Sequence, residues 1–286
     1  MSMPYQDRYW ESADGLKLHF RDYAGREDRP PVICLHGLTR NARDFESLAE
    51  HLAGDWRAIV PEVRGRGMSE YAKDPMTYTP LTYVADLAAL LEQEGISRFI
   101  SIGTSMGGLM TMLMAARDPT RIIAAVLNDI GPEVDPVGLK RIGNYIGQAR
   151  NYPTWIHAAR GLQEVHSAAF PEFDLEQWLV MGKRTMVLGQ NGRVSLDYDM
   201  AIAEPFKQSD NAAPPNLWPA FEALVNVPVT LLRGELSDLL SEATEAKMKE
   251  LHPAMQTVIV PNVGHAPTLD EPEARVAIDA LLAQLG

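Results

Sequence analysis

The sequence predicts a three-layer α/β fold, in which helices cover both faces of a mostly parallel, eight-stranded β-sheet. Short runs of branched apolar residues recur along the chain. They are continuous rather than alternating, as in strands that are buried on both faces. Longer helical patterns lie between these runs, as expected for crossover helices. At 286 residues, the chain is long enough for one large domain with an insertion.

Six buried strands and an edge hairpin make up the predicted sheet. The strands correspond to the apolar runs at residues 32–35, 58–60, 99–102, 122–127, 229–232 and 257–260. The hairpin joins segments at residues 9–12 and 16–23 through Asp14 and Gly15, a pair typical of tight turns between antiparallel strands.

Helical patterns fill the intervals between the strands. Residues 41–53 and 81–94 are amphipathic, and Gly95 ends the second pattern. Residues 105–117 are apolar on nearly all sides, which predicts a helix buried against the sheet. The last helix begins near Pro272, where acidic residues and a proline suit a helix N-terminus.

The region from residue 132 to residue 219 breaks this alternation. It contains no clear parallel strand, but it has helical patterns at residues 139–150, 155–165, 175–188 and 198–206. Pro214, Pro215 and Pro219 mark its end. We therefore expect an inserted helical cap over residues 132–219 and a core made of residues 1–131 and 220–286.

Composition and charge argue against several classes of function. A formal net charge of −12 repels a phosphate backbone, so we expect no nucleic-acid partner. The first ten residues do not resemble a signal peptide, and the longest apolar stretch, 109–116, is far shorter than the ~20 residues that span a bilayer. We therefore expect a cytoplasmic protein without a membrane partner. The single cysteine, Cys34, excludes an internal disulfide and a thiolate metal cluster.

A G-x-S-x-G motif at residues 103–107 lies between a predicted strand and the predicted buried helix. A serine on such a turn has a strained backbone and an exposed Oγ, and Gly103 and Gly107 allow the helix to approach the strand. The amide of Met106 points from the helix N-terminus toward developing negative charge. The motif predicts Ser105 as a nucleophile and Met106 as an oxyanion donor.

A second strand end carries His36, Gly37 and Leu38. Gly37 permits a turn that brings a backbone amide, that of Leu38, toward Ser105 as the second oxyanion donor. We expect His36 to hold this loop through hydrogen bonds rather than to act as a catalyst.

His265 and Asp238 each follow the C-terminal end of a predicted strand, where sites in open α/β sheets gather. We expect His265 to be a general base, and Asp238 to hold its imidazole in the correct tautomer. Asp129, at another strand end, and Glu235 are the alternative acids. We expect five other histidines, at positions 19, 51, 157, 166 and 252, to lie on the solvated surface.

The order Ser105, Asp238, His265, with the serine turn, the loop at 36–37 and a cap before the seventh strand, resembles the α/β-hydrolase superfamily. The resemblance covers nearly the whole chain and is weakest across residues 132–219. Residues 61–69 also resemble the family's structural loop after the next strand, although Glu62 stands where the family commonly has aspartate.

The resemblance implies a serine enzyme, because a serine at position 105 argues against the haloalkane dehalogenases and epoxide hydrolases, which use a carboxylate nucleophile. Residues 105–108 are similar to those of lactonases, carboxylesterases, cofactor-free haloperoxidases and carbon–carbon bond hydrolases of aromatic-ring degradation. The last group usually has asparagine before the serine and an aromatic residue after the histidine. This chain has Thr104 and Ala266 there.

We therefore expect a serine hydrolase that cleaves a small carboxylic ester or lactone through an acyl-enzyme, without a metal or organic cofactor. A carbon–carbon bond hydrolase is one alternative, and a small-molecule binding or sensing protein with slow hydrolysis is another. Four cap residues are candidates for lining the pocket: Trp155, Trp178, Met181 and Arg184. We expect the first three to pack in the core instead, and Arg184 to be a solvated charge. The sequence does not predict the oligomeric state.

Overall fold

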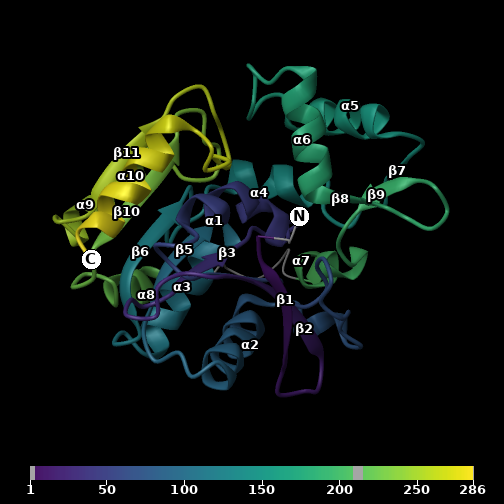
Figure 1. Cartoon of the computed structure of the whole chain (residues 1–286). Coiled ribbons are helices and arrows are strands. Elements are labelled where there is room, and N and C mark those ends of the chain that lie inside the picture. Colours follow the sequence, from purple (N-terminus) through teal and green to yellow (C-terminus); the bar gives the residue numbers. More distant parts are fainter. Residues whose placement is uncertain (1–3, 209–214, 286) are drawn as a thin grey trace.

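The centre of the molecule is an eight-stranded β-sheet with the strand order β1-β2-β4-β3-β5-β6-β10-β11 (Figure 1). The structure, a computed structural model, describes residues 4–208 and 215–285. β1 pairs with β2, and β2 with β4, in antiparallel fashion, whereas all later pairings are parallel. The strands are β1 (Gln6–Glu11), β2 (Lys17–Tyr23), β3 (Val32–Leu35), β4 (Ala58–Pro61), β5 (Phe99–Thr104), β6 (Ile122–Asn128), β10 (Val229–Gly234) and β11 (Gln256–Val260). The predicted α/β fold is confirmed.

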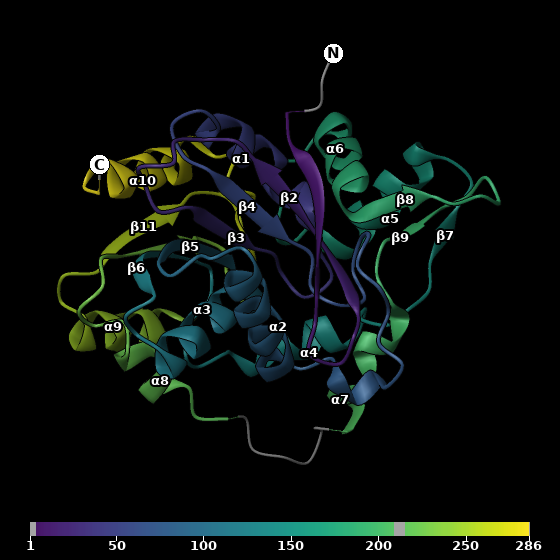
Figure 2. The ribbon, with the colours of Figure 1, turned by 60° about the horizontal axis from the view of Figure 1, so that its bottom comes forward.

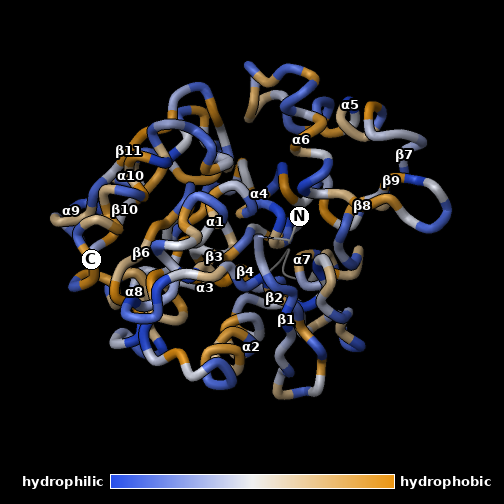
Figure 3. Tube along the Cα trace, viewed as in Figure 1, coloured by the Kyte–Doolittle hydropathy of each residue, from blue (hydrophilic) through white to orange (hydrophobic). Residues whose placement is uncertain are grey.

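Helices cover both faces of this sheet (Figure 2). One face carries α2 (Pro80–Gln93), α3 (Met106–Arg117), α8 (Trp218–Glu222) and α9 (Glu242–Leu251), and the other carries α1 (Glu46–Leu52) and α10 (Pro272–Ala283). The sequence of β3 is continuously apolar because both faces of the strand are buried. Ile33 and Leu35 pack against the first group of helices, and Val32 and Cys34 against the second. In Figure 3, hydrophobic residues gather toward the interior of the molecule, whereas the edge strand β1 and many loops are hydrophilic.

Two glycines allow α3 to lie directly against the sheet. A Cβ atom on Gly107 would lie 2.0 Å from the carbonyl oxygen of Leu35, and one on Gly103 would lie 2.5 Å from the backbone of Gly107. Because backbone atoms occupy these positions, no side chain fits at either residue. The close approach expected from the G-x-S-x-G motif is therefore present.

The segment between β6 and β10 contains helices and a small antiparallel sheet, β7-β9-β8. Before α8, its elements are α4 (Pro136–Gly143), β7 (Asn151–Tyr152), α5 (Trp155–His166), α6 (Leu175–Thr185), β8 (Met186–Leu188), β9 (Val194–Leu196), the 3₁₀ turn η3 (Met200–Ala203) and α7 (Glu204–Gln208). We did not predict this sheet, and the helical pattern expected at 175–188 ends at Thr185. Asn191 and Gly192, between the short apolar runs of β8 and β9, are the hairpin signal that could have revealed it.

The division of the chain at residues 132 and 219 stays a prediction. Of the three prolines expected to mark the end of the cap, Pro219 lies in the first turn of α8 and Pro214 lies outside the described residues. None of the helices in the described ranges combines the length and apolar character that crossing a bilayer requires.

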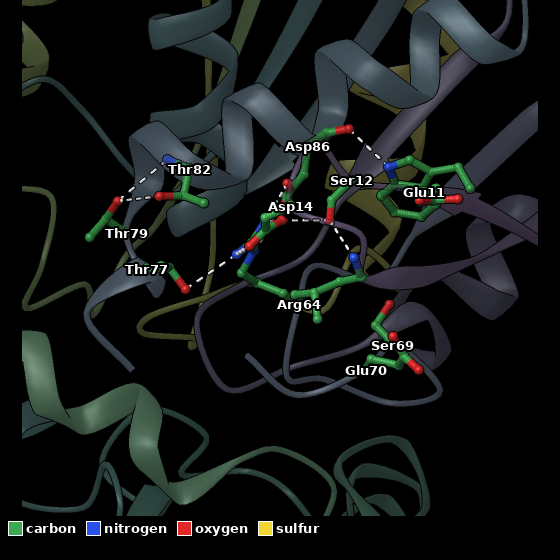
Figure 4. A network of polar contacts seen from close by, with 12 residues as sticks. Glu11, Ser12, Asp14, Arg64, Ser69, Glu70, Thr77, Thr79, Thr82 and Asp86 are labelled. Carbon is green, nitrogen blue, oxygen red and sulfur yellow. Dashed lines mark hydrogen bonds and ion pairs between the residues drawn. The ribbon is translucent and has the colours of Figure 1, made fainter. Parts of the chain in front are cut away.

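Arg64 links the β1–β2 hairpin to α2 through a polar network that is buried at α2 and exposed at the hairpin (Figure 4). Its guanidinium donates to both carboxylate oxygens of Asp86 at 2.7 Å, and to Asp14 at 2.8 and 2.9 Å. The side chains of Arg64 and Asp86 are only 2% and 4% exposed, so neither charge has water as an alternative partner.

Glu62 holds the loop that follows β4. Its carboxylate accepts hydrogen bonds from the amides of Ala42 and Met68, at 3.0 and 2.7 Å, and contacts His19 Nδ1 at 2.8 Å. The surface position that we expected for His19 is therefore wrong, because its side chain is 1% exposed. His252 is also buried, and its Nε2 is bonded to the carbonyl of Val227.

Candidate active site

Ser105 and His265 lie in hydrogen-bond contact, with 2.8 Å between Ser105 Oγ and His265 Nε2. Ser105 sits between β5 and α3 with φ 53° and ψ −117°. This left-handed backbone is strained for a residue with a side chain, and such strain is concentrated at functional sites. His265 follows β11, and the fold brings it to Ser105 across 160 positions of sequence.

The carboxylate that contacts His265 belongs to Asp129, whose Oδ2 is 2.8 Å from Nδ1 of the imidazole. Asp129 follows β6 directly, has φ 55°, and its side chain is completely buried. It also accepts the amide of Gly234 at 2.9 Å and the hydroxyl of Ser237 at 2.7 Å. A carboxylate only accepts, so His265 carries its proton on Nδ1 and Nε2 accepts from Ser105. This arrangement allows a hydroxyl to be deprotonated for nucleophilic attack.

The expected contact between Asp238 and His265 is absent. Asp238 instead accepts two hydrogen bonds from Arg141 of α4, at 2.5 and 2.8 Å. Burial alone would raise the pKa of Asp238, but the guanidinium outweighs it and holds this pKa below its ordinary value. The physical reason is the loop after β10: Gly234 and Ser237 turn toward Asp129, and Asp238 then faces α4.

Glu235, the other alternative acid, is also directed elsewhere. Its carboxylate accepts the amide of Asn262 at 2.9 Å, beside the end of β11.

The two residues whose amides we expect to form an oxyanion hole belong to segments that flank Ser105. Met106 is the first residue of α3, and a Cβ on Gly37 would lie 3.7 Å from Ser105 Cβ, which places the loop containing Leu38 beside the serine. Among residues 4–208 and 215–285, neither the Leu38 amide nor the Met106 amide has an assigned acceptor. The role of these two amides as oxyanion donors stays a prediction.

His36 stabilises this loop, as expected. Its Nδ1 donates to the carbonyl of Gly37 at 2.8 Å, and its Nε2 accepts the amide of Val63 at 3.2 Å. Burial lowers its pKa to about 4, so the ring stays neutral and can accept at Nε2.

A cavity of about 120 Å³ lies over Ser105 and His265. Its apolar side is formed mostly by the segment between β6 and β10: Ile142, Leu162, Val165, Phe170, Met181 and Leu196. Such a lining suits a short apolar substituent.

The four candidate pocket residues divide between the cavity and the core. Met181 and Arg184 line the cavity, and Arg184 is paired with Asp270 at 2.5 Å. Trp178 is 1% exposed and packs edge-on against Phe170, and Trp155 packs at the border of the same core.

Residues 30–272 match the family model for the alpha/beta hydrolase fold. The chain belongs to the α/β-hydrolase family. This hydrolase is 38% identical over 269 residues to the 3-hydroxybutyrate-oligomer hydrolase of Cupriavidus necator, a match that covers 92% of this chain and 91% of the relative. It is 25% identical over 236 residues to the 2-(acetamidomethylene)succinate hydrolase of Mesorhizobium japonicum, covering 82% and 81% of the two chains. A crystal structure of an alpha/beta hydrolase from Novosphingobium aromaticivorans is 60% identical, with a TM-score of 0.96 over 99% of this chain and 100% of that one.

His166 of this hydrolase lines the same cavity, although we expected it on the surface. Burial and then the charges of Arg40, Arg141 and Arg150 lower its pKa to about 3, so its imidazole is neutral near pH 7. A sequence signal was available, because His166 lies four residues after the buried Leu162 on one face of α5.

The described part of the hydrolase contains no group of three or more histidine, cysteine, aspartate or glutamate side chains placed to hold a metal ion. Cys34 is completely buried in β3, and this burial raises the pKa of its thiol. It is therefore a packed apolar residue rather than a reactive thiolate.

Proposed function

We propose that this hydrolase cleaves carboxylic esters through an acyl-enzyme formed on Ser105. The observation that carries the proposal is the continuous row Asp129–His265–Ser105, joined by two contacts of 2.8 Å. His265 Nε2 takes the proton of Ser105 Oγ as the oxygen attacks the ester carbonyl carbon. Asp129 keeps the imidazole oriented and stabilises the imidazolium that forms.

The negative charge on the tetrahedral intermediate is then held by the amides of Leu38 and Met106. When the intermediate collapses, the bond to the alcohol oxygen breaks and the imidazolium returns its proton to that oxygen. In the second half of the cycle, a water molecule gives a proton to His265 and attacks the acyl carbon. The bond from that carbon to Ser105 Oγ then breaks, the imidazolium returns its proton to Oγ, and the carboxylic acid leaves.

A short ester of a hydroxyalkanoic acid is the substrate class that we infer. The 38% identical relative is named a 3-hydroxybutyrate-oligomer hydrolase, and an oligomer of a hydroxy acid is a chain of ester bonds. The small cavity with an apolar side supports a unit of this size. This inference is narrower than the small ester or lactone expected from the sequence.

Two esters and one covalent probe test the proposal. We expect turnover of p-nitrophenyl butyrate and of the linear dimer of 3-hydroxybutyrate, and labelling of Ser105 by a fluorophosphonate. Ser105→Ala should remain folded by circular dichroism, lose labelling and lose about 10³-fold or more in kcat. Absence of both turnover and labelling in the wild type would reject the proposal in favour of a binding protein. Turnover of a vinylogous diketone without ester turnover would favour the carbon–carbon bond hydrolase.

A further inference from the structure

We propose that Arg150 forms a carboxylate-binding site in the cavity, so that the preferred ester substrate carries a free carboxylate group. The inference rests on the proposed ester hydrolysis and adds the charge of the substrate to it. Arg150 lies between α4 and β7 and lines the cavity that also contains Ser105 and His265.

Arg150 differs from the other arginines of the cavity because it has no carboxylate partner among the residues that the structure describes. Arg40 is paired with Asp44 at 2.6 Å, and Arg184 with Asp270 at 2.5 Å. Arg150 has neither an ion pair nor a side-chain hydrogen bond to any residue in 4–208 or 215–285, and it is half-buried. A partly desolvated cation without a partner is costly, and an anionic ligand would offset this cost.

The charges around the cavity favour an anion although the whole chain has a net charge of −12. Asp44 is the acidic residue among those that line the cavity, and its charge is matched by Arg40. Arg141, which does not line the cavity, is paired with Asp238. Asp270 contacts Arg275 at 2.8 Å as well as Arg184, so this carboxylate adds no excess negative charge. The buried carboxylate of Asp129 contacts the side of the His265 ring opposite Ser105. Arg150 is the lining arginine that has no carboxylate contact among the described residues.

The behaviour of His166 agrees with this electrostatic picture. Burial is the main cause of its low pKa, and the next causes are the positive charges of Arg40, Arg141 and Arg150. Arg150 is therefore close enough to the cavity for its charge to act on the imidazole of His166.

The guanidinium group suits a carboxylate better than other ligands of similar size, because its parallel N–H groups donate to both carboxylate oxygens. The phenol of Tyr198 also lines the cavity, and burial raises its pKa to about 12, so it remains a hydrogen-bond donor. A linear oligomer of a hydroxy acid has one free carboxylate, on the terminal unit that supplies the alcohol oxygen of the last ester bond. Binding of that group would direct cleavage to the terminal ester bond and favour dimers over long chains.

Matched pairs of substrates, with and without the free carboxylate, test the inference. One pair is the 3-hydroxybutyrate dimer and its methyl ester, in which the charge lies on the alcohol part. The other is p-nitrophenyl hydrogen glutarate and its methyl ester, in which the charge lies on the acyl part. In at least one pair we expect kcat/KM of the acid to exceed that of the methyl ester tenfold or more.

Three variants assign this preference to Arg150. Arg150→Gln should bring the acid-to-methyl-ester ratio toward one, mainly through a higher KM for the acid. Arg150→Lys should keep an intermediate ratio, because it retains the charge and loses the paired donors. Arg160→Gln removes an equal charge from the exposed side of α5, outside the cavity, and should leave the ratio unchanged.

A binding measurement keeps the inference testable without turnover. In the Ser105→Ala background, calorimetry should give a dissociation constant for the dimer that rises at least tenfold on adding Arg150→Gln. Ratios within twofold of one in both pairs, or an affinity unchanged by Arg150→Gln, would overturn the carboxylate site. Failure of the proposed function looks different, because no ester, charged or methylated, would then show turnover that depends on Ser105.

Discussion

The carboxylate of Asp129 lies 2.8 Å from Nδ1 of His265, although 136 positions of sequence separate the two residues. Asp129 is held by two further donors, the amide of Gly234 and the hydroxyl of Ser237, so its orientation does not depend on the histidine alone. Asp238, at the end of the neighbouring strand, is bound by Arg141. These contacts give the two aspartates different expected roles.

Replacing each aspartate by asparagine separates these roles. We expect Asp129→Asn to lower kcat for ester hydrolysis by about 10⁴, because an amide at this position favours the wrong imidazole tautomer. Asp238→Asn should change kcat by less than about tenfold, because it weakens only the contact with α4. Steady-state kinetics on one ester, with both proteins checked for folding, decide the question. The opposite ranking would return the acid role to Asp238.

Gly107 should not tolerate even a methyl group. A Cβ there would lie 2.0 Å from the Leu35 carbonyl oxygen, so Gly107→Ala must displace β3 or α3. We expect a loss of about 3 kcal/mol or more in the free energy of unfolding, at the upper end for overpacked sites. Gly143→Ala is the matched control: a Cβ on this residue of α4 would meet no atom of another segment within 4 Å, and a change below about 1 kcal/mol is expected. Equal denaturation midpoints for the two variants would contradict this account of the serine turn.

Removing one partner of the buried pair Arg64–Asp86 should strongly lower the free energy of unfolding. Asp86→Ala leaves the guanidinium of Arg64, only 2% exposed, without its buried partner, and should cost about 3–5 kcal/mol. Asp14 contacts the same guanidinium, but its side chain is 53% exposed, and Asp14→Ala should cost at most about 1 kcal/mol. Urea unfolding at neutral pH measures both. Similar losses for the two variants would show that burial does not govern this network.

Glu62 should make the stability of the protein depend on pH. Burial alone would raise its pKa, but His19 and the amides of Met68 and Ala42 outweigh burial and hold the pKa below the ordinary 4.5. A lowered carboxyl pKa stabilises the folded state above pH 4.5, and this contribution is lost as the pH falls through the lower folded-state value.

The comparison of Glu62→Gln with the wild type tests that dependence. We expect the variant to lose about 1–3 kcal/mol at pH 7, as for hydrogen bonds to a charged group. The difference between the two free energies of unfolding should shrink progressively below pH 4.5. A difference that stays constant from pH 7 down to pH 3 would mean that the charge of Glu62 does not contribute.

Much of the fold was predictable because its signals are local. Consecutive apolar residues indicate the buried strands. Two glycines, which leave room for a close backbone, indicate the turn at Ser105. His265 was recognisable from its position after the last strand. The exception was the β8–β9 hairpin. β8 continues the apolar spacing of α6 and was therefore assigned to that helix, whereas β9 was not assigned to any element.

What the sequence determined by itself was the sheet, the serine turn and the identity of the histidine, since each depends on neighbouring residues. The choice of acid was decided by tertiary structure, because β6 and β10 are adjacent and both bring an aspartate to the same edge of the sheet. The amide of Gly234 and the hydroxyl of Ser237 select Asp129, and Arg141, from a helix far along the chain, binds Asp238. The position of Arg150 is equally non-local. Whether an arginine has a carboxylate partner depends on which segments pack around it. A pattern of residues adjacent in the sequence does not predict that packing.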